Sequence, residues 1–301
     1  MGYIVTGGAG FIGSNLVRKL ASEGNAVIVI DNLHTGNEKN LEKIENVTFV
    51  KGDASEISKV REDVSGVFHL GIYSSSPMYK ENPLLVGEAV KQFAGVLEFC
   101  RKKDCGLAWA STSSVYNGVR PPHSENAAIN VTDYYSETRH YMERMAELYH
   151  GLYGMKSAGL RYFSVYGPHE EFKGRYANLV TQFLLAALKG VQPVVYGDGT
   201  QKRDFIFVED VVRANLKAME SGAHGVFNAG TGKSYTINEM VAMLGKATGR
   251  EIMPKYVDNP MKNYVAETLA DTSKAKNTLG FEAKVGLGEG IGKIHEYYSK
   301  L

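Results

Sequence analysis

Short runs of β-branched residues alternate with longer amphipathic segments along the first two thirds of the chain. Most runs are almost continuously apolar, as expected of strands that are buried on both faces of a sheet. In the first intervening segment, Ile12, Leu16 and Leu20 share one helix face, and Gly24 follows as a stop signal. Strands and helices in this order predict an α/β fold, a Rossmann-type doubly wound parallel sheet with right-handed crossovers. The predicted strands cover Tyr3–Thr6, Ala26–Asp31, Val47–Lys51, Val67–Leu70, Leu107–Ser111 and Ser157–Tyr162.

The alternation becomes irregular after about residue 165. A loop rich in glycine and charge, Gly167–Arg175, precedes a helix expected near residues 178–189, and Arg203–Phe207 is a predicted strand. Thr236 and Glu239 form a capping box that predicts the start of a late helix. We therefore expect a nucleotide-binding core over residues 1–165, with returning segments around 203–230. A smaller C-terminal α/β lobe over residues 166–301 is expected to bind substrate.

A glycine-rich segment, Gly7 to Gly13, connects the first predicted strand to the first predicted helix. Gly7 allows a tight turn, Gly10 lets the backbone approach a pyrophosphate, and Gly13 lets the helix pack close to the strand. The exposed amides and the positive end of the helix favour phosphate groups. The second strand ends in Asp31, where a carboxylate accepts hydrogen bonds from a ribose diol and repels a 2′-phosphate. The segment therefore predicts a site for NAD rather than NADP.

Composition and charge narrow the class of protein further. The 301 residues carry 34 basic and 33 acidic side chains, a net charge of +1, so nucleic acid is not expected as the main partner. The 2 cysteines, Cys100 and Cys105, exclude a disulfide framework or a four-cysteine metal site, and no metal is expected. No apolar run approaches the about 20 residues of a membrane span. We expect a soluble, cytoplasmic protein.

Several motifs resemble those of the extended short-chain dehydrogenase/reductase family, which contains nucleotide-sugar epimerases and dehydratases. The glycine spacing of Thr6–Gly13 is similar to that of the family, and the resemblance covers essentially the whole chain. Other similar segments are Gly52-Asp53, Val67–Gly71, Ser111–Tyr116, Arg161–Pro168, Tyr196–Phe205 and, resembling a C-terminal helix, Ala270–Ala275 with Leu279-Gly280. The resemblance implies NAD contacts from Gly7, Gly10, Phe11, Ile12, Asp31, Asn32, Asp53, Leu70, Gly71, Tyr135 and Arg139.

In this family a tyrosine four residues before a lysine forms the active site together with a serine or threonine hydroxyl. The tyrosine removes a proton from a sugar hydroxyl while the carbon-bound hydrogen moves as hydride to the nicotinamide. The matching residues here are Tyr135, Arg139 and Thr112. Arginine keeps the positive charge that favours a phenolate, but its planar fork cannot replace an ammonium without rearrangement. Two interpretations stay open: a variant active site, or a catalytically silent NAD-binding regulator.

The residues after Thr112 discriminate between the reactions of the family. Dehydratases carry an Asp-Glu pair there and decarboxylases a glutamate, whereas this chain has Ser113 and Ser114 and lacks that acid–base group. The resemblance favours a 4-epimerase of UDP-glucose and UDP-galactose, with a UDP-N-acetylhexosamine or a UDP-uronic acid as alternatives. The segment Asn259–Lys262 departs from the family pattern and leaves the sugar open. Substrate contacts carried over from the family are Ser113, Asn178, Tyr196 and Arg203.

Members of this family pair as homodimers through two helices each. The corresponding helices are expected here at about residues 83–103 and 135–153. The second helix carries an apolar stripe made of Tyr141, Met145, Leu148, Tyr149 and Leu152. The resemblance implies a homodimer, with a nucleotide sugar as the small-molecule partner.

Overall fold

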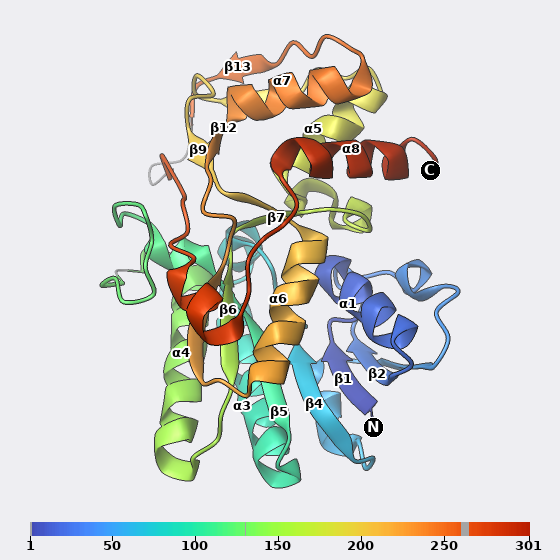
Figure 1. The fold of residues 1–301 in the computed structure, drawn as a ribbon, viewed down its shortest axis with the longest axis vertical. Coiled ribbons are helices and arrows are strands. Elements are labelled where there is room, and N and C mark those ends of the chain that lie inside the picture. The colour runs from blue at the N-terminus through green and yellow to red at the C-terminus, as the bar shows by residue number, and fades with distance from the viewer. Residues whose placement is uncertain (1, 130, 260–264) are drawn as a thin grey trace.

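The computed structural model describes residues 2–129, 131–259 and 265–301, so part of the divergent segment Asn259–Lys262 lies outside the described residues. A seven-stranded parallel sheet forms the lower half of the molecule in Figure 1, in the order β11-β6-β5-β4-β1-β2-β3. Its strands are β1 (Gly2–Thr6), β2 (Ala26–Asp31), β3 (Val47–Lys51), β4 (Val64–His69), β5 (Gly106–Thr112), β6 (Ala158–Tyr162) and β11 (Gly225–Ala229). This arrangement confirms the predicted Rossmann-type fold.

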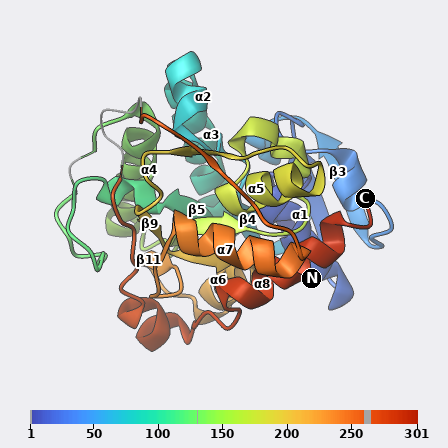
Figure 2. The same ribbon diagram turned by 90° about the horizontal axis from the view of Figure 1, so that it is seen from above.

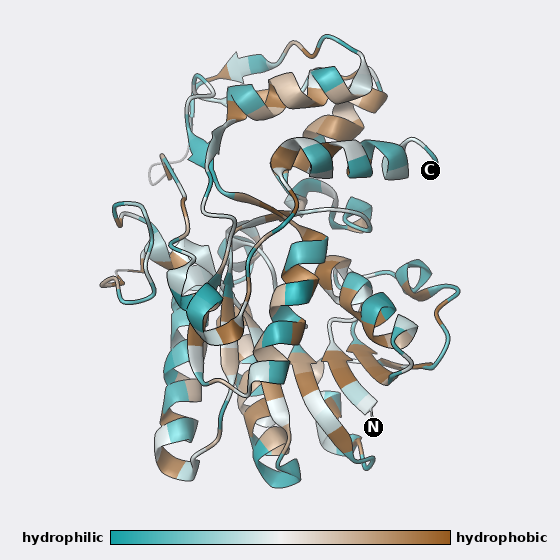
Figure 3. Cartoon of the chain, in the orientation of Figure 1, coloured by the Kyte–Doolittle hydropathy of each residue, from teal (hydrophilic) through white to brown (hydrophobic). Residues whose placement is uncertain are grey.

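Helices cover both faces of the sheet because successive side chains of each strand point to opposite faces. Ile4 packs with α3 (Leu85–Lys103) and α4 (Tyr134–Tyr153), whereas the next residue, Val5, packs with α1 (Phe11–Ser22) and α6 (Val208–Ser221). Figure 3 shows hydrophobic residues concentrated on the strands and polar residues along the outer faces of the helices. The near-continuous apolar runs therefore form two separate cores, one on each side of the sheet.

One tryptophan lies in the core between the sheet and the helices α3 and α4. Trp109 on β5 is 1 % exposed, and its ring lies 5.0 Å from the ring of Phe93 on α3. A Cβ added to Gly159 on the neighbouring strand β6 would collide with the indole ring. Gly159 therefore makes room for Trp109.

A smaller lobe lies at the carboxyl ends of the strands, at the top of Figure 1. Its core is formed by α5 (Leu179–Leu188), α7 (Ile237–Thr248) and α8 (Leu287–Tyr298), which Figure 2 shows beside one another from above. The capping box at the start of α7 is present, with Thr236 and Glu239 hydrogen-bonded in both directions. The division of the chain at residue 165 stays a prediction. The remaining short elements are α2 (Ser76–Glu81), β7 (Ser164–Tyr166), β8 (Val194–Tyr196), β9 (Lys202–Arg203), β10 (Phe205–Phe207), β12 (Tyr235–Thr236), β13 (Lys255–Val257), η1 (Glu38–Leu41), η2 (Ala54–Lys59), η3 (Ser113–Tyr116), η4 (Glu171–Tyr176) and η5 (Ala275–Leu279).

Two local expectations differ from the structure. The strand predicted over Arg203–Phe207 divides at Asp204, because this buried carboxylate accepts backbone hydrogen bonds from Thr231, Gly232 and Ala270. As a result β9 pairs with β12, while β10 pairs with β7. The C-terminal helix expected around 270–280 is present but short: residues 273–279 are helical, of which η5 is a π-helical turn, and Gly280 ends the helix. Along the apolar stripe of α4, Tyr141, Leu148 and Leu152 are exposed, whereas Met145 and Tyr149 pack against the core.

None of the helices among the described residues is long and apolar enough to cross a membrane.

Candidate active site

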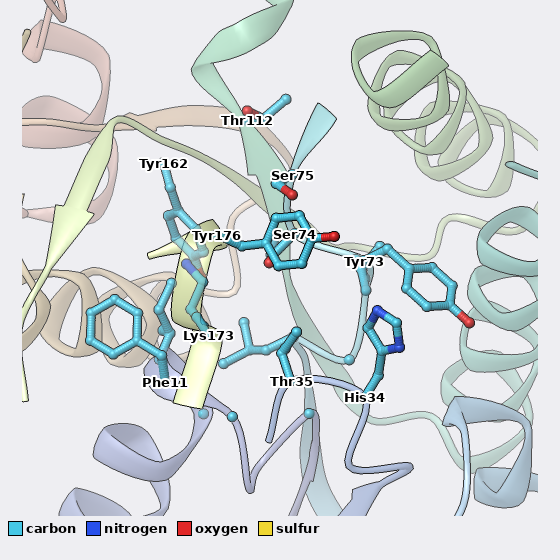
Figure 4. A pocket seen from close by; sticks show the side chains of 18 of the residues that line it. Phe11, His34, Thr35, Tyr73, Ser74, Ser75, Thr112, Tyr162, Lys173 and Tyr176 are labelled. Carbon is cyan, nitrogen blue, oxygen red and sulfur yellow. The ribbon is translucent and has the colours of Figure 1, made fainter. Parts of the chain in front are cut away.

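A cavity of about 420 Å³ lies at the carboxyl ends of the strands, between the sheet and the smaller lobe (Figure 4). The strand order reverses direction between β1 and β4, and such a switch point is where α/β sheets bind ligands. The volume is in the range of small-molecule sites. The predicted site residues that line it are Gly7, Gly10, Phe11, Ile12, Asp31, Asn32, Asp53, Leu70, Gly71, Thr112, Ser113, Tyr135, Arg139 and Asn178.

The glycine loop forms the floor of the cavity at the start of α1. Gly7 has φ +70°, and a Cβ there would lie 2.6 Å from the backbone nitrogen of Gly71, so only glycine fits this close approach. A Cβ on Gly13 would collide with the Gly7 carbonyl oxygen. Among the described residues no side chain caps the first turn of α1, which follows Gly10. The loop therefore fits the pyrophosphate of a dinucleotide, which uncapped amides at a helix start bind.

Asp31 lies at the end of β2 and is 7 % exposed. Its carboxylate accepts hydrogen bonds from the amides of Ala9 at 3.0 Å and Leu33 at 2.7 Å. Burial raises the pKa of Asp31, and these two hydrogen bonds oppose the shift. Asp31 lines the cavity and each carboxylate oxygen can accept a further hydrogen bond, so Asp31 fits the ribose diol of NAD. Asp53, which also lines the cavity, caps η2 through the amide of Ser55.

The end of β5 and the start of α4 are fastened together beside the glycine loop. Thr112 is buried, and its hydroxyl accepts a hydrogen bond from the Ser114 amide at 3.1 Å. The hydroxyl of Ser136 on α4 donates to the Ser114 carbonyl at 3.2 Å, and Asp133 caps the same helix through the Ser136 amide. Tyr135, in the first turn of this helix, is thus held on the same cavity as Thr112 and Ser113.

Arg139 is 2 % exposed and lies beside Tyr135, with its guanidinium carbon 5.1 Å from the centre of the tyrosine ring. Its Nη2 donates to the carbonyl of Tyr73 at 2.8 Å, its Nη1 contacts the sulfur of Met142, and its Nε has no partner among the described residues. Burial and the Arg139 charge lower the pKa of His69 to about 3. The arginine therefore keeps a cation next to Tyr135 and also holds the loop that follows β4.

That loop contributes cavity residues that the motifs did not indicate. Tyr73 lies edge-on to His34, with 5.1 Å between the ring centres, and its hydroxyl donates to Glu88 at 2.7 Å. Tyr79 continues the aromatic row from Tyr73 to Tyr135. The carboxyl ends of parallel strands meet at one edge, and this rule would have indicated the loop from its sequence position. The sequence motifs also did not indicate other lining residues in the loops after β2 and β4. These residues are Thr35, Gly36, Ile72, Ser74, Ser75 and Ser76.

The smaller lobe closes the cavity through η4 and the start of α5. Glu170 is fully buried, and its carboxylate accepts hydrogen bonds from the Asn178 amide at 2.8 Å and the Thr181 hydroxyl at 2.6 Å. Burial raises the pKa of Glu170, whereas Lys173 and these hydrogen bonds lower it. Lys173 and Tyr176 both line the cavity, as Figure 4 shows. The charged loop of the sequence contained these residues, but its irregular pattern gave no sign of where each side chain lies.

Two predicted substrate residues do not line this cavity. Tyr196 at the end of β8 is 42 % exposed, and Arg203 on β9 is partly buried, with its Nη1 donating to the Lys202 carbonyl. Their roles stay predictions. No group of three or more His, Cys, Asp or Glu side chains suited to a metal ion occurs in the described part of the chain.

The fold and cavity are those of a dinucleotide-binding α/β protein, and comparison with known proteins specifies the family. The family model for the NAD dependent epimerase/dehydratase family matches residues 3–230. The chain therefore belongs to this family of NAD-dependent enzymes.

Individual relatives are similar over nearly the whole chain. The UDP-glucose 4-epimerase of Thermotoga maritima, solved with UDP-glucose, is 35% identical with a TM-score of 0.93, covering 100% of this chain and 99% of that chain. The UDP-N-acetylglucosamine 4-epimerase of Methanobrevibacter ruminantium M1, solved in complex with UDP-N-acetylmuramic acid, is 31% identical with a TM-score of 0.94 and the same coverage. The UDP-glucuronate 4-epimerase of Thermodesulfobacterium geofontis is 32% identical, covering 96% of this chain and 93% of the relative.

Proposed function

We propose that the protein is an NAD-dependent 4-epimerase of a nucleotide sugar, with UDP-glucose and UDP-galactose as the first candidate pair. One observation carries the proposal: Thr112, Ser113 and Tyr135 line the same cavity as the glycine loop and Asp31. The two serines after Thr112 provide no carboxylate for loss of water or of carbon dioxide, which favours epimerisation over the other reactions of such sites.

In the proposed reaction each residue has a defined part. Tyr135 takes the proton of the sugar 4-hydroxyl, and the Thr112 hydroxyl orients that oxygen. Arg139 supplies a positive charge beside the ring of Tyr135. Bound NAD supplies the chemistry of accepting a hydride from C4 and returning it. The 4-keto sugar would rotate so that the opposite face of C4 receives the hydride. Tyr135 would return the proton to the oxygen on C4, and the configuration at C4 would thereby be inverted.

Three similar relatives carry names that specify different sugars, so the sugar has to be found by experiment. Purified protein is incubated with UDP-glucose, UDP-N-acetylglucosamine and UDP-glucuronic acid in turn, and the 4-epimers are separated by chromatography. Equilibration of UDP-glucose with UDP-galactose is the expected result. Equilibration of one of the other two sugars alone would select an alternative substrate.

The second candidate is a catalytically silent NAD-binding regulator, and Arg139 is the observation that favours it. The guanidinium is directed to Tyr73 and Met142. Such a regulator binds NAD but forms no epimer from any nucleotide sugar. If Arg139→Lys gains activity that the natural protein lacks, the silent interpretation replaces the epimerase.

A homodimer is part of the same proposal. The helices α3 and α4 pack on each other, and α4 exposes Tyr141, Leu148, Leu152 and Tyr153. An apolar face of this kind on a surface helix favours burial against a second copy. Light scattering should give the mass of a dimer, and Leu148→Asp should shift it toward a monomer. A monomeric natural protein would contradict this part. The cytoplasmic location stays a prediction.

A further inference from the structure

The cavity has few basic side chains to balance the negative charge of the ligands that the proposed function requires. NAD and a nucleotide sugar each carry a diphosphate anion. The described lining residues include three basic side chains, His34, Arg139 and Lys173, against the acids Asp31, Asp53 and Glu170. Arg139 is almost fully buried and donates to Tyr73, while Arg203 does not line the cavity. Lys173 is therefore the lysine to consider as an anion-binding group.

Lys173 lies on η4, in the smaller lobe, and reaches across to the glycine loop. Its ammonium nitrogen is 5.5 Å from the centre of the Phe11 ring, and Phe11 is the first residue of α1. The Lys173 side chain is 17 % exposed, and Figure 4 shows it pointing into the cavity. The ammonium group is thus held near the helix start where phosphate groups are favoured.

A buried carboxylate fixes the position of Lys173. Its nitrogen is 3.2 Å from Oε1 of Glu170, which is fully buried and is itself held by the Asn178 amide and the Thr181 hydroxyl. A lysine ammonium has three donors, and Glu170 occupies one of them. The others remain for a ligand, so the pair presents a positioned cation rather than a closed ion pair.

We propose that Lys173 binds the diphosphate of a nucleotide ligand in this cavity. The inference rests on the proposed function in that it takes a dinucleotide and a nucleotide sugar to share the cavity. Both ligands offer the same chemistry, a diphosphate diester, and the ammonium lies between the lobe and the glycine loop. The test has to separate the two sources.

The test compares Lys173→Met with Lys173→Arg and with a matched control, Lys59→Met. Lys59 pairs with Glu56 three residues earlier, as Lys173 pairs with Glu170, but its side chain is 73% exposed. Dissociation constants are measured by ligand-observed NMR titration. NAD and its phosphate-free control adenosine are titrated separately into the full chain. UDP and its phosphate-free control uridine are titrated separately in the presence of saturating NAD. Losing a charge-assisted hydrogen bond to phosphate should weaken binding roughly ten- to a hundredfold in Lys173→Met.

Weaker NAD binding alone assigns Lys173 to the cofactor, and weaker UDP binding alone assigns it to the substrate. Adenosine and uridine should bind unchanged, Lys173→Arg should recover most of the affinity, and Lys59→Met should match the natural protein. The inference is overturned if neither diphosphate ligand loses affinity, or if adenosine and uridine lose as much, since the lysine then only supports the lobe. Lys173→Gln repeats the test if the methionine variant unfolds. These titrations need no turnover, so they are independent of whether epimerisation is found.

Discussion

The two walls of the cavity are built in different ways. On the sheet side, Gly7 follows β1, Gly13 lies in the first turn of α1 and Asp31 ends β2. Backbone geometry determines where these residues lie. On the lobe side, Glu170 and Lys173 belong to an irregular segment whose position depends on contacts distant in sequence, such as the Glu170 amide donating to the hydroxyl of Tyr298. The first wall can be recognised from local spacing, whereas the second requires the assembled molecule.

The largest expected effect comes from Tyr135, which lines the cavity at the start of α4. Tyr135→Phe should lower turnover at least about a hundredfold, because it removes a positioned proton-transfer group, while NAD and UDP bind as before. Steady-state kinetics together with both binding constants measure this. Tyr134→Phe is the control, since Tyr134 is 53% exposed and does not line the cavity. Loss of turnover in the control, with normal turnover in Tyr135→Phe, would move the base to Tyr134.

On the sheet side, the largest loss of stability should follow from breaking the buried pair of Glu143 and Arg161, which is hydrogen-bonded to the cavity residue Ser111. Arg161 donates two hydrogen bonds to Glu143, at 2.8 and 2.6 Å, and Ser111 donates a third at 2.6 Å. Arg161→Met leaves a buried carboxylate without its cation, which costs about 3–5 kcal/mol of unfolding free energy. Urea unfolding measures it. Arg101→Met, which breaks an exposed pair, should be nearly neutral, and equal losses in both variants would remove the distinction.

The same pair gives a pH dependence with a definite sign. Burial raises the pKa of Glu143, but Arg161 and the other hydrogen bonds outweigh it and hold the pKa below the ordinary 4.5. The stability from this pair is therefore complete above pH 4.5 and is lost as the pH falls through the lowered value. Over that acidic range, the unfolding free energy of Arg161→Met should fall less than that of the natural protein. If the two plots of unfolding free energy against pH are parallel, the pH dependence does not come from this pair.

A change at Asp31, on the sheet wall, should affect dinucleotide binding but not UDP binding. Asp31→Asn should weaken NAD roughly tenfold or more through the lost charge-assisted hydrogen bonds, and it should narrow the preference for NAD over NADP. UDP binding should be unchanged. Calorimetric titration of both dinucleotides checks this, with the exposed Asp63→Asn as control. Equal affinities of the natural protein for NAD and NADP would refute the role of Asp31.

The smallest effect on ligand affinity is expected from the exposed contact between α2 and η4, which links the two walls. Arg175 and Tyr176 on η4 both hydrogen-bond to Glu81 on α2, at 2.8 and 2.9 Å. The pair is exposed, so Glu81→Gln should change UDP affinity by a few-fold at most. A UDP titration beside Lys173→Met measures this. A larger loss in Glu81→Gln than in Lys173→Met would show that the walls are held together by this contact.

These differences explain what could be predicted from the sequence. The glycine loop and Asp31 could be placed because a tight turn and a strand end fix their geometry. The Tyr135–Arg139 spacing predicted two residues on one helix face, but not that the guanidinium reaches the Tyr73 carbonyl. That contact depends on how the loop after β4 folds back toward α4, and spacing along α4 does not contain it.

The lobe shows the opposite case. Asp204 interrupts a run that reads as a strand, because three backbone amides distant in sequence converge on its carboxylate. The apolar stripe of α4 likewise contains both exposed residues and residues that pack on the core, and spacing along the helix does not separate them. Glu143 is a charged residue that is buried because Arg161 pairs with it. Hydrophobic periodicity counts only apolar positions, so it cannot predict the burial of such a residue.

The position of Trp109 has a practical consequence for spectroscopy. It is the 1 tryptophan of the chain, it is 1 % exposed, and it lies beneath α3 rather than at the cavity. Its fluorescence should therefore be blue-shifted and should respond to the melting of the sheet and α3. Unfolding confined to the smaller lobe should leave this emission unchanged while circular dichroism at helical wavelengths falls. The protein thus contains an intrinsic optical probe that reports on one half of the molecule only.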